Sequence, residues 1–206
     1  MPLRFPQTIV VALRRARGPI GLVAATYAAA VITGVAMVHE GNAFALRYRD
    51  ELVGTAITSS ASIAALNRGL PLRAAVMDFG GNLVLGAIPS TLMGLAVVLP
   101  FPFAAFRGWV GGVVSVDGQH QSRLRSRRER LYYLGVIFLQ LLPYSLAGGA
   151  GVRAGLAFLR PHSRFGYPQS TRWLGLPVDA LRDVLRIYCV VVPLFLLASL
   201  VEFLAR

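Results

Sequence analysis

The sequence has no lysine, a single cysteine and few charges for its 206 residues. Only 15% of the residues are charged, whereas a soluble domain carries about 25%, so the composition excludes an ordinary soluble globular protein. The single cysteine, Cys189, excludes an internal disulfide, and its position in an apolar run predicts a buried structural thiol. Arginine takes the place of lysine throughout, as in proteins of GC-rich bacteria.

Long apolar runs make up most of the chain, which is 55% hydrophobic with a mean hydropathy of +0.60. Uncharged apolar runs of about 18 residues or more are candidate membrane spans. The sequence therefore predicts an all-α, polytopic transmembrane helical bundle that forms a single integral membrane domain over residues 1–206. The expected spans are 18–38, 79–99, 102–116, 131–158 and 184–204. The third is short, and a re-entrant segment with four full spans is the alternative. The loop 39–78 contains helical patches that suit a membrane surface.

The formal net charge of +12 comes from arginines that lie beside the apolar runs, at 14–17, 123–130 and 160–186. This placement predicts contacts with anionic lipid headgroups rather than with nucleic acid. The numbers of arginines in the loops on the two sides of the membrane are similar, so they favour neither orientation strongly. We expect the N-terminus to lie on the inner side.

Catalytic and metal-binding motifs are missing from the sequence. It has no HExxH, no GxSxG and no pair of intramembrane aspartates, so we expect no enzyme and no catalytic residues. The glycine-rich stretch AGGAGVRAG (147–155) lies in an apolar helix rather than after a strand, which argues against a nucleotide-binding loop. His39, His120 and His162 are too far apart to predict a metal site, and we expect no cofactor.

Small residues recur at intervals of four along the predicted spans, and positions four apart share one face of a helix. Such faces allow close helix packing and suit contacts with partner membrane proteins. They comprise Asn82, Gly86, Ser90 and Gly94; Gly108 and Gly112; and Ala147, Gly151 and Gly155. Arg153 points away from the last of these faces, and we expect it to extend toward the headgroups.

Four polar residues within or beside the spans are candidates for function. Glu202 interrupts the last apolar run, where an acid is costly and often functional, although it would also suit a span that ends at the interface. Arg107 would reach the turn near 100–103 or pair with Glu202 or Asp78. Asp78 and Asn82, one helical turn apart, suit an ion or polar substrate, or a carboxylate at a helix start.

The stretches FRGWVGG (106–112), LAGGAGVRAGLAFLRP (146–161) and LFLLASLVEFLAR (194–206) resemble the stage II sporulation protein M family of integral membrane proteins, over about residues 75–205. In that family an Asn-Gly pair often begins the third span, where this chain has Arg107 and Gly108. A stretch similar to 147–155 and a final glutamate, here Glu202, are also typical. This chain departs from the family at Gln140, which stands near a usual glutamate, and in having no histidine before it. The resemblance implies membership of a membrane complex that acts with cell-wall hydrolases in spore formers, and scaffold or transport-associated roles elsewhere.

Two functions follow as hypotheses. The first is a non-catalytic membrane subunit or scaffold that packs against other integral membrane proteins in a larger complex. The second is a component of a membrane transporter or channel, with broken helices near Pro89 and Pro143 and with Arg107, Asn82 and Gln140 along the pathway. In both cases we expect a multi-pass protein of the bacterial inner membrane.

Overall fold

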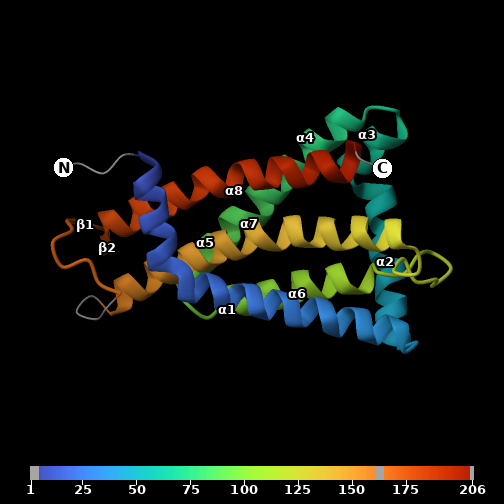
Figure 1. The fold of residues 1–206 in the computed structure, drawn as a ribbon, viewed down its shortest axis with the longest axis horizontal. Coiled ribbons are helices and arrows are strands. Elements are labelled where there is room, and N and C mark those ends of the chain that lie inside the picture. The colour runs from blue at the N-terminus through green and yellow to red at the C-terminus, as the bar shows by residue number, and fades with distance from the viewer. Residues whose placement is uncertain (1–4, 161–164, 205–206) are drawn as a thin grey trace.

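The computed structural model describes residues 5–160 and 165–204. Most of these residues are helical, and a two-stranded antiparallel sheet lies before the last helix (Figure 1). The elements are α1 (Phe5–His39), α2 (Ala43–Ser59), α3 (Ala61–Asn67), α4 (Pro71–Gly81), the π-helix η1 (Asn82–Ala87), α5 (Ile88–Gly94), α6 (Pro100–Val113), α7 (Arg127–Leu159), β1 (Arg172–Trp173), β2 (Leu176–Pro177) and α8 (Val178–Leu204). His162 and Arg206 lie outside the described residues.

The all-helical prediction is confirmed, but the five spans are not. Three helices are long and apolar enough to cross a membrane: Pro6–His39, Arg127–Leu159 and Val178–Leu204. The region expected to hold the second span instead combines α4, η1 and α5. Helix α6 has 14 residues, or about 21 Å at 1.5 Å per residue, which is short of a hydrocarbon core of about 30 Å.

The π-helix η1 arises where Pro89 interrupts the helical hydrogen bonds. Proline has no backbone N–H and its ring collides with the preceding turn. The chain responds with a wider turn, in which the Ile88 N–H donates to the Leu83 carbonyl, five residues back. A reversal over residues 95–99 follows, where Val97 adopts a positive φ of 66°, and Pro100 is the first residue of α6.

Figure 1 shows the later part of α1 running beside α7 and α8, while the first turns of α1 cross them at one end and α2 stands across the other end. Asn42 begins α2 by accepting hydrogen bonds from the backbone N–H groups of Phe44 and Ala45, each at 3.1 Å. The Tyr48 ring then packs on Trp109 of α6, with ring centroids 4.9 Å apart. Aromatic residues of this kind gather at membrane–water interfaces, so this cluster suits a boundary of the apolar layer at α2.

The bundle is held together by close approaches between helix backbones. Gly34 of α1 lies against Gly112 of α6, where an added Cβ would be 3.0 Å from the Gly112 Cα. Gly94 of α5 lies against Gly151 of α7, with 2.6 Å from such a Cβ to the Gly151 Cα. Any side chain at these glycines would push the helices apart, which is the packing mode that replaces hydrophobic burial in a bilayer.

Two side chains lie differently from the sequence prediction. Cys189 is exposed on the outside of α8, because an apolar run in a membrane protein can face lipid as well as the core. Arg153 is only 6% exposed and does not extend away from the protein, because the loop between α7 and α8 folds over it and provides its partners.

Candidate functional site

A chain of hydrogen bonds links α4, η1, α7 and α8 inside the bundle. The Asp78 Oδ2 accepts from Asn82 Nδ2 at 2.9 Å and from Ser199 Oγ at 2.7 Å. The Tyr144 hydroxyl donates to Asn82 Oδ1 at 2.7 Å. Because α4 begins at Pro71, Asp78 lies late in the helix, and the expected carboxylate at a helix start is wrong. These bonds hold the carboxylate in a partly buried position that would otherwise be costly.

Glu202 takes part in a second polar contact between α7 and α8. Its Oε2 accepts from Gln140 Nε2 at 2.9 Å, and its backbone carbonyl accepts from the Tyr132 hydroxyl at 2.8 Å. Helix α8 ends at Leu204, so Glu202 lies in its last turn, and its role at the end of the span stays a prediction. The sequence singled out Gln140 as a departure from the sporulation family and as a residue along a transport pathway, and in the structure it is the hydrogen-bond partner of this acid.

Arg107 lies between the two polar groups, on α6. Its guanidinium carbon is 4.6 Å from the centroid of the Tyr144 ring and 5.4 Å from that of Phe103. Among the described residues, no carboxylate lies within ion-pair distance of Arg107. The alternative of an ion pair with Glu202 or Asp78 is therefore not realised, although Asp78 lines the same hollow as Arg107. The contacts of the guanidinium with the two aromatic faces contribute about 0.5–2 kcal/mol.

A cavity of about 730 Å³ lies between α6 and α7 and reaches Arg107. Gln140, Tyr27 and Glu202 lie along it with Arg107, and valine and isoleucine side chains line its apolar walls at Val110, Val114, Val136 and Ile137. The loop between α6 and α7 contributes Asp117, Arg123 and Arg125. A volume in this range accommodates a small organic molecule.

Arg107 also lines a second hollow of about 390 Å³, which contains Asp78, Asn82, Ser60 and Ser62. Arg107 therefore lines two cavities from one position in α6. This placement connects the residues that the sequence marked separately as polar candidates. Tyr144 contacts both Asn82 and Arg107 and was not predicted from the sequence. Its position four residues after Gln140, on the same helix face, is the signal that could have found it.

The loop beside the larger cavity is tied down by carboxylates. Asp50 of α2 contacts His120 Nε2 at 3.0 Å and Arg49 Nη1 at 2.8 Å. Hydrogen bonds from Arg49 and His120 lower the pKa of Asp50 below 3.8. Asp117 accepts from the backbone N–H groups of Gln121 and Gln119, which lowers the pKa of Asp117 in the same way.

We expect this loop to loosen at acidic pH. A carboxylate with a lowered pKa in the folded state stabilises the fold above its unfolded pKa, and this contribution is lost as pH falls through the folded value. A nitroxide attached at Gln119→Cys, in a Cys189→Ser background, should therefore gain mobility below about pH 4, as measured by electron paramagnetic resonance. With Asp50→Asn added, it should be more mobile already at pH 7. The same label at Ser59→Cys on α2 is the control, and an equal response at both positions would contradict the prediction.

The small residues expected at helix contacts lie between helices of this chain. Thr91 of α5, for example, donates to the carbonyl of Ala147 in α7 at 3.0 Å. The remaining neighbours are Tyr144 for Gly86, Gly148 for Ser90, Gly151 for Gly94, Tyr27 for Gly108, Val31 for Gly112, Thr91 for Gly151 and Leu95 for Gly155. These faces are occupied by internal packing, so a partner protein would have to use others.

No group of three or more histidine, cysteine, aspartate or glutamate side chains is arranged to hold a metal ion among the described residues. No family model, curated protein or solved structure matches this chain. The fold and the site define its class: an all-helical protein with three apolar helices of membrane-spanning length, compatible with a membrane protein, and a partly polar cavity between its helices.

Proposed function

We propose that this chain is a non-catalytic component of a membrane transporter or channel, and that its larger cavity accepts an organic anion at Arg107. The observation that carries the proposal is the arginine itself, a cation that lines the cavity with no carboxylate within ion-pair distance in the part of the chain that the structure describes. Arg107 is partly buried, and a positive charge in the wall of a cavity with an apolar lining attracts an opposite charge. An anionic solute would supply that charge.

The acids along the cavity support an anion rather than a cation as the solute, because each already has donors from the chain. Glu202 accepts from Gln140, Glu129 from Ser126 at 2.9 Å, and Asp117 from two backbone N–H groups. The apolar walls favour a solute with an apolar part. A medium-chain carboxylate such as octanoate combines both features.

The cavity lies toward one end of the bundle, and core packing closes the other side. The rings of Tyr144 and Phe195 meet edge to face with centroids 4.8 Å apart, and both side chains are buried. Transport would require this packing to open. Pro143 in α7 and Pro193 in α8 are positions at which the helices can bend.

Cysteine labelling tests whether water and solute reach this cavity. In a Cys189→Ser background, Val136→Cys in the cavity wall should react with a membrane-impermeant methanethiosulfonate in proteoliposomes, and octanoate should slow the reaction. Leu134→Cys is the control, because Leu134 lies on the same helix, is 49% exposed and does not line the cavity. Equal reactivity at the two positions, or no protection by octanoate, would count against the proposal.

The role of subunit or scaffold in a larger complex, in the bacterial inner membrane and within the sporulation protein M family, stays a prediction from the sequence. It is compatible with a transport component that works with partners. The outward faces of α1 and α8 present large apolar side chains such as Leu22, Ile32 and Leu185 and are surfaces that such a partner could contact.

A further inference from the structure

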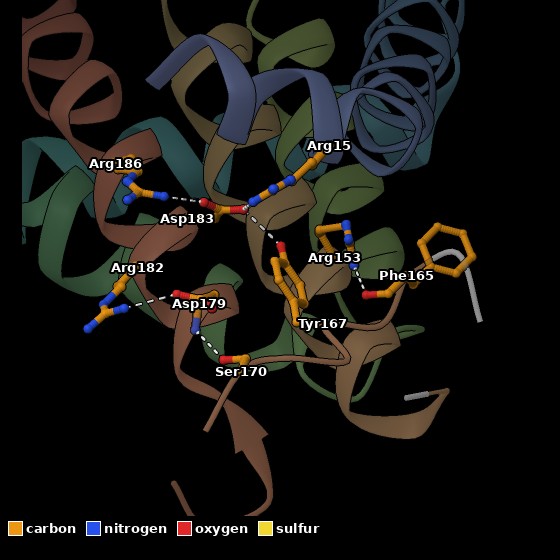
Figure 2. A network of polar contacts seen from close by, with 9 residues as sticks. All are labelled: Arg15, Arg153, Phe165, Tyr167, Ser170, Asp179, Arg182, Asp183 and Arg186. Carbon is orange, nitrogen blue, oxygen red and sulfur yellow. Dashed lines mark hydrogen bonds and ion pairs between the residues drawn. The ribbon is translucent and has the colours of Figure 1, made fainter. Parts of the chain in front are cut away.

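A second polar network lies at the other end of the bundle, where α8 begins and β1 and β2 are found (Figure 1). Its centre is Asp183, which is 3% exposed. This carboxylate accepts from Arg15 at 3.0 Å, from Arg186 at 2.8 Å and from the Tyr167 hydroxyl at 2.8 Å (Figure 2). Burial raises the pKa of Tyr167 to about 12, so its hydroxyl stays protonated and continues to donate near neutral pH.

Arg153 enters this network from α7, and no carboxylate of the described residues lies within ion-pair distance of it. Its guanidinium lies 4.9 Å from the centroid of the Tyr167 ring and 5.5 Å from that of Phe165, and it donates to the Phe165 carbonyl. Its Nε is buried with no hydrogen-bond partner among the described residues. Arg15 stacks on the same Tyr167 ring at 5.4 Å, which brings two guanidinium groups together around one tyrosine.

The charges of the network do not balance. Arg15, Arg153 and Arg186 gather around Asp183, and the neighbouring Asp179 is paired with Arg182 at 3.0 Å. Arg153 is buried, and Arg15 and Arg186 share the single carboxylate of Asp183, so an added anion would offset the remaining positive charge. The structure therefore contains a positive site larger than its own carboxylates can neutralise.

A hollow of about 310 Å³ lies next to this excess charge. Arg15, Arg153, Tyr167 and Ser170 line it, together with Asp179 and the residues between Tyr167 and Ser170. Ser170 Oγ also accepts from the Asp179 N–H at the start of α8. The positive end of the α8 dipole adds to the attraction for an anion.

We infer that this hollow binds a phosphate group, held by Arg153 and Arg15. The planar guanidinium forms parallel hydrogen bonds to phosphate oxygens, and Arg15 and Arg153 both line the hollow. The site lies beside the ends of two helices of membrane-spanning length, α7 and α8, where phospholipid headgroups are found. The phosphate would come from such a headgroup or from solution, and the two sources can be separated by experiment.

The test uses three probes on the purified full chain in a mild detergent: dihexanoyl phosphatidylglycerol, dihexanoylglycerol without the phosphate, and inorganic phosphate. Calorimetric titration should show binding of the phospholipid and none of the phosphate-free analogue. Binding of the phospholipid alone assigns the site to a lipid headgroup. Competition by inorganic phosphate at similar concentration assigns it to the phosphate group itself.

Arg153→Gln and Arg15→Gln should each weaken this binding about tenfold or more, since each removes charged hydrogen bonds. Arg15 is 45% exposed in its side chain, so its replacement keeps the test valid if the buried Arg153→Gln variant does not fold. Arg14→Gln is the matched control, because Arg14 lies on the same helix, is exposed and does not line the hollow. Equal binding of the phosphate-free analogue, or an equal loss with Arg14→Gln, would overturn the inference.

Discussion

Arg107→Gln is expected to reduce octanoate binding to the larger cavity by about tenfold to a hundredfold. Hydrogen bonds to a charged group contribute about 1.5–3 kcal/mol, and about 1.4 kcal/mol corresponds to a factor of ten. Glutamine keeps a polar side chain but removes the positive charge, which has no carboxylate partner among the described residues. Titration calorimetry in detergent gives the affinity directly.

The neutral analogue octanol separates charge recognition from apolar binding. Its affinity should change little in Arg107→Gln, because the apolar walls at Val110 and Val136 are untouched. Arg73→Gln is the matched control, since Arg73 is an exposed arginine on α4 outside both cavities. If octanoate binds Arg107→Gln and Arg73→Gln equally well, Arg107 is not the anion site and the proposed function loses its main support.

Gly151→Ala is expected to destabilise the bundle, and Gly151→Leu to prevent recovery of folded protein. A Cβ at Gly151 would lie 2.9 Å from the Thr91 Cα and closer still to the Thr91 carbonyl oxygen. Both atoms belong to the α5 backbone, so the contact can be relieved only by moving α5 away from α7. Overpacking of this kind costs about 1–3 kcal/mol for a small change and more for a large one.

Gly135→Ala provides the control within the same helix. Gly135 is exposed, and an added Cβ would meet nothing within 4 Å. This substitution should be neutral or stabilising by up to about 1 kcal/mol, because alanine favours a helix more than glycine does. Thermal denaturation followed by size-exclusion chromatography in detergent compares the variants. Equal midpoints for Gly151→Ala and Gly135→Ala would show that the α5–α7 contact is looser than described.

The larger cavity and the hollow near Asp183 both use arginine, but in different surroundings. Arg107 lines a cavity with apolar walls and contacts aromatic rings, whereas Arg15 and Arg153 share a surface hollow with Asp183 nearby. The tests are independent, because octanoate reports on the first and a phospholipid on the second. A protein with both binding sites would bind its solute inside the helix bundle and a lipid headgroup at one end of the bundle.

The sequence alone determined that this protein is helical and that it has apolar helices of membrane-spanning length. Both follow from the length of the uncharged runs, which is a local property of the chain. Arg107, Asn82 and Glu202 were also recognisable, because a polar residue in an apolar run stands out without any knowledge of its neighbours. The regular spacing of Gly94, Gly108 and Gly151 marked helix faces in the same way.

Only the tertiary structure decided which of these residues meet. Hydropathy does not distinguish the lipid-facing side of a helix from its core side, which is why Cys189 was predicted to be buried and is exposed. After a proline interrupts a helix, the length of the next helix depends on how the chain restores its backbone hydrogen bonds. For this reason η1 and the short α6 are found where the spans 79–99 and 102–116 were expected. The burial of Arg153 depends on a loop that folds back from beyond α7. Contacts of this kind join residues far apart along the chain, and no local pattern specifies them.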